Sequence, residues 1–114
     1  MKNQNYETLL LPTINDVYCI PVDAIVRVEA SSSYSKVFCR DQALPIVASK
    51  VLRWFENNLP AQSFARVHRT HLVNKKYVVS VGRDRLRLET GLTVSISRRK
   101  KKKVMEGWLK RIEE

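Results

Sequence analysis

The sequence predicts a mostly β domain, antiparallel, with a short mid-chain helix and a second helix at the C-terminus. Three observations predict this class. Short segments such as 25–29 and 85–89 alternate apolar and charged residues, as half-buried strands do. Turn residues separate these segments at short intervals. Only 50–58 and 98–112 instead carry apolar residues at helical spacing. The 114 residues contain no repeat or linker, so residues 1–114 are expected to form one domain.

The first half of the chain predicts five short strands joined by turns. Pro12 ends the first of them, and Thr13–Asp16 has the composition of a turn. Pro21 begins one short helical turn over 21–24, and Ala30–Ser35 is expected to be a small polar loop. The expected strands are Tyr6–Leu11, Val17–Ile20, Ile25–Glu29, Lys36–Arg40 and Leu44–Ala48.

The mid-chain helix is expected over Lys50–Asn58, with Ser49 as its N-cap and Pro60 beyond its end. Its spacing places three apolar residues on one face, which should pack on the sheet. These residues are Val51, Leu52 and Phe55, with Trp54 at the margin.

The second half predicts a three-stranded meander followed by the C-terminal helix. The strands are expected at Tyr77–Val81, Arg85–Glu89 and Leu92–Ile96, with Leu86 and Leu88 facing the core. Turns fall at 82–84 and 90–91. Ser97 should cap a helix over Arg98–Ile112. Its apolar stripe consists of Val104, Met105, Trp108, Leu109 and Ile112.

The net charge of +10 is confined to one half of the chain. Residues 1–57 hold six basic and six acidic residues, so the whole excess lies in residues 58–114. Solubility alone does not require such an asymmetry. The pattern favours a polyanionic partner, nucleic acid before an anionic membrane surface.

The run of six cations at Arg98–Lys103 falls on the first turns of the predicted C-terminal helix. Cations at a helix N-terminus oppose the macrodipole, and neighbouring cations repel one another. Phosphate groups would relieve both costs, because side chains and free N–H groups would bind them together. The alternative is an ordinary solvated charged face. The dipole conflict favours anion binding.

Several classes of site are not indicated. Cys19 and Cys39 are isolated and lie in apolar strands, which suggests buried, reduced thiols in a cytoplasmic protein. His68 and His71 would face opposite sides of an extended strand, so no metal site is expected. Carboxylates are scattered and no glycine-rich phosphate loop occurs, so neither an enzyme nor a cofactor is expected. No apolar segment could span a bilayer, and no secretion signal opens the chain.

The stretch Phe64–Asn74 breaks the regular pattern of a strand. Phe64 and Leu72 have even numbers, whereas Val67 and Val73 have odd numbers, so one flat strand cannot bury all four. The mismatch predicts a kink or turn near 69–71, which would direct polar side chains out of the sheet. His68 is expected to form structural hydrogen bonds beside this kink.

This stretch resembles the signature of the LytTR-type (LytR/AlgR family) DNA-binding domain, which lies at the C-terminus of many bacterial response regulators. The order phenylalanine, arginine, Val-His-Arg and Leu-Val-Asn is similar to the family pattern. Segments 20–25, 28–34 and the Ser97-Arg-Arg99 triplet add to the likeness. The resemblance implies an elongated antiparallel β fold whose loops read successive major grooves of double-stranded DNA. It also implies a transcription regulator of a two-component system, two copies on paired half-sites, and a receiver domain that this sequence does not contain.

The resemblance also assigns site residues by position. The base contacts that it implies are Ser35, Tyr34, Arg69, Arg98 and Arg99. Phosphate contacts are expected from the neighbouring basic residues, namely Lys36, Arg66, Lys100, Lys101, Lys102 and Lys103. Some family members carry histidine in place of Ser35 and asparagine in place of Arg69, so the base preference stays open.

Two other functions are compatible with the basic half. An RNA-binding β module could use the same charges, although few aromatic residues fall at strand centres where bases would stack. A protein-interaction or membrane-surface domain could use the C-terminal helix. The apolar stripe of that helix is better explained as core packing, which a small domain needs.

Overall fold

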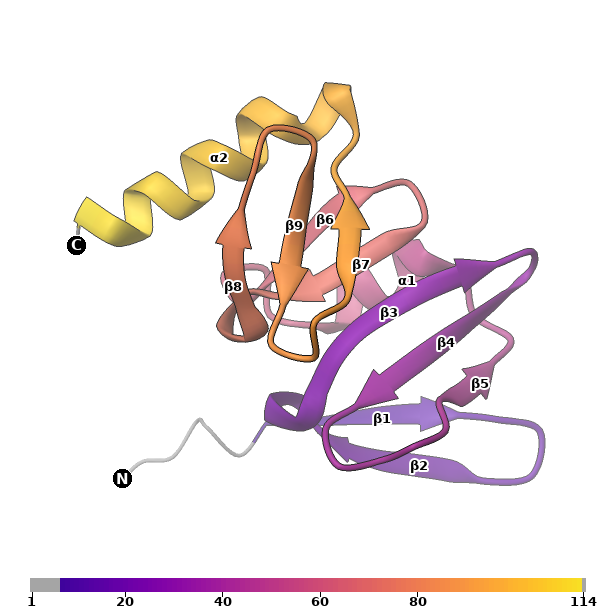
Figure 1. Ribbon diagram of the computed structural model, residues 1–114. Helices are drawn as coiled ribbons and strands as arrows, with labels where there is room; N and C mark the ends of the chain where they lie inside the picture. Colours follow the sequence, from indigo (N-terminus) through magenta and orange to yellow (C-terminus); the bar gives the residue numbers. More distant parts are fainter. Residues whose placement is uncertain (1–6, 114) are drawn as a thin grey trace.

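A computed structural model describes residues 7–113, with side chains described for residues 7–107. The predicted mostly β class is confirmed, with ten strands and two α-helices in this range. All strand pairings are antiparallel, and they form three sheets (Figure 1). The molecule is flattened, measuring 41 × 40 × 25 Å, so its two long axes are nearly equal.

The central sheet has five strands in the order β5-β4-β3-β7-β6. These strands are β3 (Ile25–Ser31), β4 (Tyr34–Cys39), β5 (Ile46–Ala48), β6 (Phe64–His68) and β7 (His71–Asn74). A small sheet of β1 (Thr8–Pro12) and β2 (Val17–Pro21) precedes it. A meander follows it, made of β8 (Val78–Val81), β9 (Arg85–Leu88) and β10 (Thr93–Ser95). Single 3-10 turns, η2 (Val22–Ala24) and η3 (Lys75–Tyr77), directly precede β3 and β8.

The central sheet separates two hydrophobic cores. Ile25 and Val28 of β3 belong to the first core, together with the β1–β2 sheet and helix α1 (Leu52–Asn58). Val26 and Val73 belong to the second core, together with β8–β10 and the start of helix α2 (Arg98–Glu113). Side chains on the two faces of the sheet therefore pack against different partners.

The start of helix α1 differs from the prediction. The helix begins at Leu52 with Val51 as its N-cap, and no side chain caps it. Ser49 lies too early because the chain is still extended at Val51, where φ is −76° and ψ is 163°. Leu52 and Phe55 are buried as expected, but Val51 is 60% exposed, so it does not belong to the packed face.

The start of helix α2 agrees with the prediction. The helix begins at Arg98, and the Lys100 N–H donates to the Ser97 hydroxyl oxygen at 3.2 Å. Val104 is buried in the second core. The expected core side chains of Trp108, Leu109 and Ile112 lie outside the described residues, as does the expected strand start at Tyr6.

Two further expectations need correction. The Ala30–Ser35 loop is shorter than expected, because β3 continues to Ser31 and β4 begins at Tyr34, with Ser32 in the left-handed region (φ 59°). Cys39 is buried, but Cys19 is exposed. Cys19 pairs with Leu10 on the outer face of the β1–β2 sheet, while the neighbouring pair, Leu9 and Ile20, faces the core.

Candidate nucleic-acid interface

Three turns lie along one edge of the molecule (Figure 1). They are the β3–β4 turn, the β6–β7 turn and the connection between β10 and α2. Backbone hydrogen bonds join them: the Ala30 N–H donates to the Thr70 carbonyl at 2.9 Å, and the Ser97 N–H donates to the Val67 carbonyl at 2.8 Å. The β6–β7 turn is therefore held between the other two segments.

The signature stretch folds into two strands rather than one. β6 and β7 pair with His68 opposite His71, and Arg69 and Thr70 form the turn between them. The register shifts between Arg66 and His68. This shift explains the irregular apolar pattern, and the turn at Arg69 and Thr70 confirms the predicted turn near 69–71. The Arg69 side chain is exposed and has no hydrogen-bond or ionic partner in the described part of the chain.

Arg66 holds this turn in place. Its guanidinium donates to the Arg69 carbonyl at 2.7 Å and to the His68 carbonyl at 3.2 Å. A third contact, 2.6 Å to the Glu56 carboxylate, connects the turn to helix α1. Because its donors are used in this way, Arg66 is a structural support of the turn in the unbound protein. The phosphate contact predicted for Arg66 would compete with these bonds.

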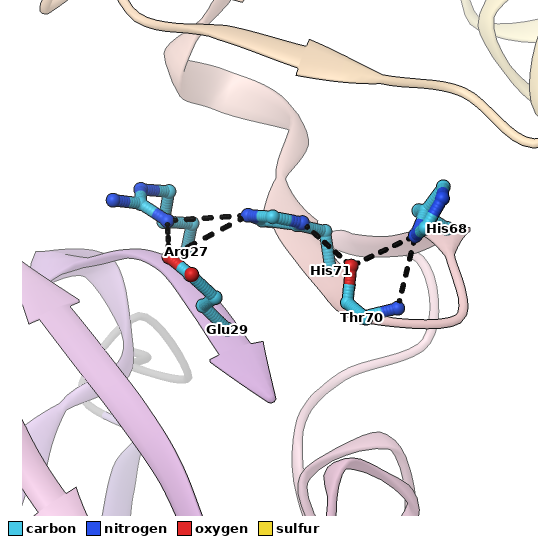
Figure 2. Close-up of polar contacts among 5 residues, drawn as sticks. All are labelled: Arg27, Glu29, His68, Thr70 and His71. Carbon is cyan, nitrogen blue, oxygen red and sulfur yellow. Dashed lines mark hydrogen bonds and ion pairs between the residues drawn. The ribbon is translucent and has the colours of Figure 1, made fainter. Parts of the chain in front are cut away.

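The two histidines lie on the same side of the hairpin, with their ring centroids 6.5 Å apart. The expectation that they face opposite sides was wrong, because a turn rather than an extended strand separates them. The Thr70 hydroxyl lies between them, 2.8 Å from Nδ1 of His68 and 3.1 Å from Nδ1 of His71 (Figure 2). His68 thus forms hydrogen bonds beside the turn, as predicted. Within residues 7–107 no cluster of three metal-binding side chains occurs.

Arg27 and Glu29 of β3 extend this polar group across the sheet (Figure 2). The Arg27 guanidinium donates to Glu29 at 2.7 Å and contacts Nε2 of His71 at 3.3 Å, while it stacks 3.7 Å from the Phe38 ring centroid. Sequence reasoning missed both residues. The alternation of β3 places them on one face, but only the pairing of Glu29 with His71 reveals the contact.

The network shifts two acid–base equilibria. The hydrogen bond from Arg27 lowers the pKa of Glu29. Burial lowers the pKa of His71, and the neighbouring charges of Arg27 and His68 add to this, while Glu29 acts in the opposite direction. Both shifts favour the forms found near neutral pH, which are a carboxylate at Glu29 and a neutral imidazole at His71.

We expect stability to fall on acidification through these two groups. As pH falls, the unfolded chain protonates His71 near pH 6.5, before the folded protein does. The contribution of His71 to stability is therefore fully present above pH 6.5 and is lost as pH falls toward the lower pKa of the folded state. Glu29 adds a second loss below its ordinary pKa of 4.5. Urea unfolding across this range measures the dependence. His71→Gln should flatten the dependence of stability on pH in the range just below 6.5. An unchanged profile would contradict the role of His71.

The β3–β4 turn presents Tyr34 rather than Ser35. The Ser35 side chain is fully buried, and its hydroxyl donates to the Lys50 carbonyl at 2.6 Å. The base contact predicted for Ser35 would require this side chain to leave its buried position and its bond to Lys50. Tyr34 is 49% exposed, and Lys36, which follows on the same face of β4, is half-buried. Ser35 is buried while Tyr34 is exposed because successive side chains of a strand point to opposite faces of the sheet.

The first turns of α2 carry the predicted basic run. Arg98, Arg99, Lys102 and Lys103 are exposed, whereas Lys100 and Lys101 are half-buried. Among the residues that the structure describes, none of these six forms an ion pair. Arg98 and Arg99 directly follow Ser97, which is bonded to β6, so they lie beside the β6–β7 turn. Over residues 7–113, no helix has the length and apolar character needed to cross a membrane.

Comparison with known proteins identifies the fold and the family of the chain. A domain of known structure from Bacillus cereus, described as the LytTr DNA-binding domain of a methyl-accepting/DNA response regulator, superposes with a TM-score of 0.76. It is 23% identical, and the match covers 89% of this chain and 95% of that one, so it shows a shared fold. No curated protein sequence matches. The family model of the LytTr DNA-binding domain matches residues 15–108. The chain therefore belongs to the LytTr family of DNA-binding domains.

Proposed function

We propose that the protein binds double-stranded DNA in a sequence-specific manner, as a cytoplasmic bacterial transcription regulator of a two-component system. The observation that carries this proposal is the edge formed by three joined turns. Arg69 and Arg99 lie on two of these neighbouring segments, beside the basic start of α2, and both are exposed without an ionic partner within the described residues. Protruding turns of this kind can enter major grooves, where arginine pairs with the O6 and N7 atoms of guanine.

The proposed roles combine the position of each residue with the chemistry of its side chain. Arg69, Arg98 and Arg99 are the proposed base readers, and Tyr34 is the proposed contact from the β3–β4 turn. Lys36 and the four lysines Lys100–Lys103 are proposed to bind phosphates and so set the register of the protein on the duplex. Two copies are proposed to occupy paired half-sites about one helical turn apart.

An RNA-binding module of the stacking type is less well supported. Within the described residues the strongly exposed aromatic side chains are Tyr18 and Tyr34, which lie on different sheets. Phe38, on the same face of β4 as Tyr34, is covered by the Arg27 guanidinium. Among the side chains of residues 7–107, no pair of neighbouring rings is therefore available for adjacent bases to stack on.

Selection of bound duplexes from a random library tests the proposal. We expect enrichment of one motif, repeated at a spacing of about one helical turn. Retention of duplexes without any enriched motif would contradict sequence-specific binding. Tighter binding of single-stranded RNA than of every duplex would favour the stacking alternative.

The salt dependence of binding should report the lysines of α2. Replacing Lys101 and Lys102 with alanine should make the slope of log K against log salt shallower by about 1.8, because each phosphate contact contributes about 0.9. The affinities for selected and for scrambled duplexes should fall by the same factor. Fluorescence anisotropy over a salt series measures both affinities. The double variant Arg40→Ala/Lys76→Ala is the matched control. It also removes two positive charges, but from residues that lie beside Asp23 and Ala24 and not on α2. An equal change in slope for both double variants would show an effect of net charge alone.

A further inference from the structure

The polar contacts in Figure 2 form one continuous chain of hydrogen bonds from β3 to the β6–β7 turn. It runs from Arg27 to Nε2 of His71, from Nδ1 of His71 to the Thr70 hydroxyl, and from that hydroxyl to Nδ1 of His68. The Thr70 N–H also donates to Nδ1 of His68 at 3.2 Å. Nε2 of His68 has no hydrogen-bond partner in the part of the chain that the structure describes.

Two fixed donors set the directions of the bonds in this chain, the Arg27 guanidinium at one end and the Thr70 N–H at the other. A guanidinium is always protonated and can only donate, so Nε2 of His71 must accept. The neutral His71 ring then carries its proton on Nδ1, which donates to the Thr70 hydroxyl oxygen. The Thr70 hydroxyl is left to donate to Nδ1 of His68. Because Nδ1 of His68 accepts, the neutral His68 ring carries its proton on Nε2.

Burial and the Arg27 guanidinium maintain this arrangement at His71 against the opposing charge of Glu29, whose carboxylate oxygen lies 3.7 Å from Nε2 of His71. Arg27 and Glu29 face His71 from β3, and Lys36 lies opposite Glu29 on β4. A proton added to Nε2 of His71 would point at the Arg27 guanidinium, whose carboxylate partner Glu29 is already bonded at 2.7 Å. Burial of His71 acts in the same direction. His71 therefore transmits the donor polarity of Arg27 without carrying charge itself.

We propose that the relay Arg27–His71–Thr70–His68 fixes Nε2 of His68 as a hydrogen-bond donor, and that this N–H binds a phosphodiester oxygen of the bound DNA. The proposal rests on the proposed DNA-binding function. His68 is half-buried and lies one residue behind the turn tip at Arg69, so it approaches the rim of a groove when Arg69 enters it. Phosphate oxygens only accept hydrogen bonds, so they match a donor of fixed polarity.

The tautomers are measurable in the free protein. Long-range ¹H–¹⁵N correlation spectra distinguish an imidazole protonated on Nδ1 from one protonated on Nε2. We expect the Nδ1–H form for His71 and the Nε2–H form for His68. Arg27→Met should mix the tautomers of His71. An Nδ1–H tautomer at His68 in the wild-type protein would overturn the relay.

Two substitutions at His68 separate the DNA contact from support of the turn. His68→Asn retains an oxygen acceptor near the place of Nδ1 but lacks a donor at the place of Nε2. His68→Gln retains a donor near Nε2 but loses the acceptor. We expect His68→Asn to weaken binding of selected and scrambled duplexes alike by about tenfold, and His68→Gln to bind more tightly than His68→Asn despite a lower melting temperature.

The outcomes are distinguishable. If the wild-type protein binds no duplex, the proposed function fails. If it binds and His68→Asn binds equally well, the function stands and the contact at His68 is excluded. A loss on the selected duplex alone would make His68 a base reader and overturn the phosphate assignment. If His68→Asn does not fold, ¹⁵N shifts of the wild-type protein on adding duplex decide: Nε2 of His68 should shift, and an unmoved signal would exclude the contact.

Discussion

Replacing Phe55 with alanine is expected to lower the free energy of unfolding by about 3–5 kcal/mol. Phe55 is completely buried between α1 and the central sheet, and its ring packs edge-on against Trp54 with centroids 5.0 Å apart. The substitution removes apolar contact area and leaves a cavity that surrounding strands cannot close without moving. Because a small domain has about 5–15 kcal/mol of total stability, this single change should remove a large part of it.

Urea unfolding followed by circular dichroism measures the effect. Val51→Ala is the matched control because it truncates an apolar side chain at the same helix, at a position 60% exposed to solvent. We expect Val51→Ala to change stability by less than about 0.5 kcal/mol. A loss below about 1 kcal/mol for Phe55→Ala would show that α1 does not close the first core.

Elements with a strong local signal could be predicted from the sequence. The alternation of Arg85–Leu88 places Leu86 and Leu88 in the core, and the helical spacing of Leu52 and Phe55 identifies the packed face of α1. The Ser97 cap followed from serine directly preceding a helical pattern. These features depend on near neighbours in the chain, which sequence patterns report directly.

Features that depend on pairing between distant strands could not be predicted in this way. Ser35 and Tyr34 exchange roles according to which face of β4 covers the core, and no local pattern in a serine-rich turn determines that face. Arg27 meets His71 only because β3 pairs with β7, 44 residues later. Arg66 was predicted only as one of several phosphate-binding cations. Its three contacts to the turn and to α1 depend on the folded arrangement of the chain.

This difference between Arg66 and Arg69 underlies the second prediction. Arg69→Ala should weaken binding to the selected duplex by about 1–3 kcal/mol and change binding to scrambled DNA little. The Arg69 side chain is exposed without a partner in the described residues, so its loss should leave the melting temperature nearly unchanged. Arg69→Lys should restore only part of the affinity, because lysine lacks the planar fork that contacts two guanine atoms. Anisotropy titrations on both duplexes, with thermal unfolding, measure these effects.

Arg66→Ala is the matched control, three residues away on the same hairpin. It removes the bonds to the carbonyls of His68 and Arg69 and the ion pair with Glu56, so it should lower stability and weaken both duplexes equally. The ratio of the affinity for the selected duplex to the affinity for the scrambled duplex therefore separates base recognition from structural support of the turn. That ratio should fall for Arg69→Ala and stay constant for Arg66→Ala. A constant ratio in both variants would place base recognition elsewhere on this edge, with Arg99 as the next residue to replace.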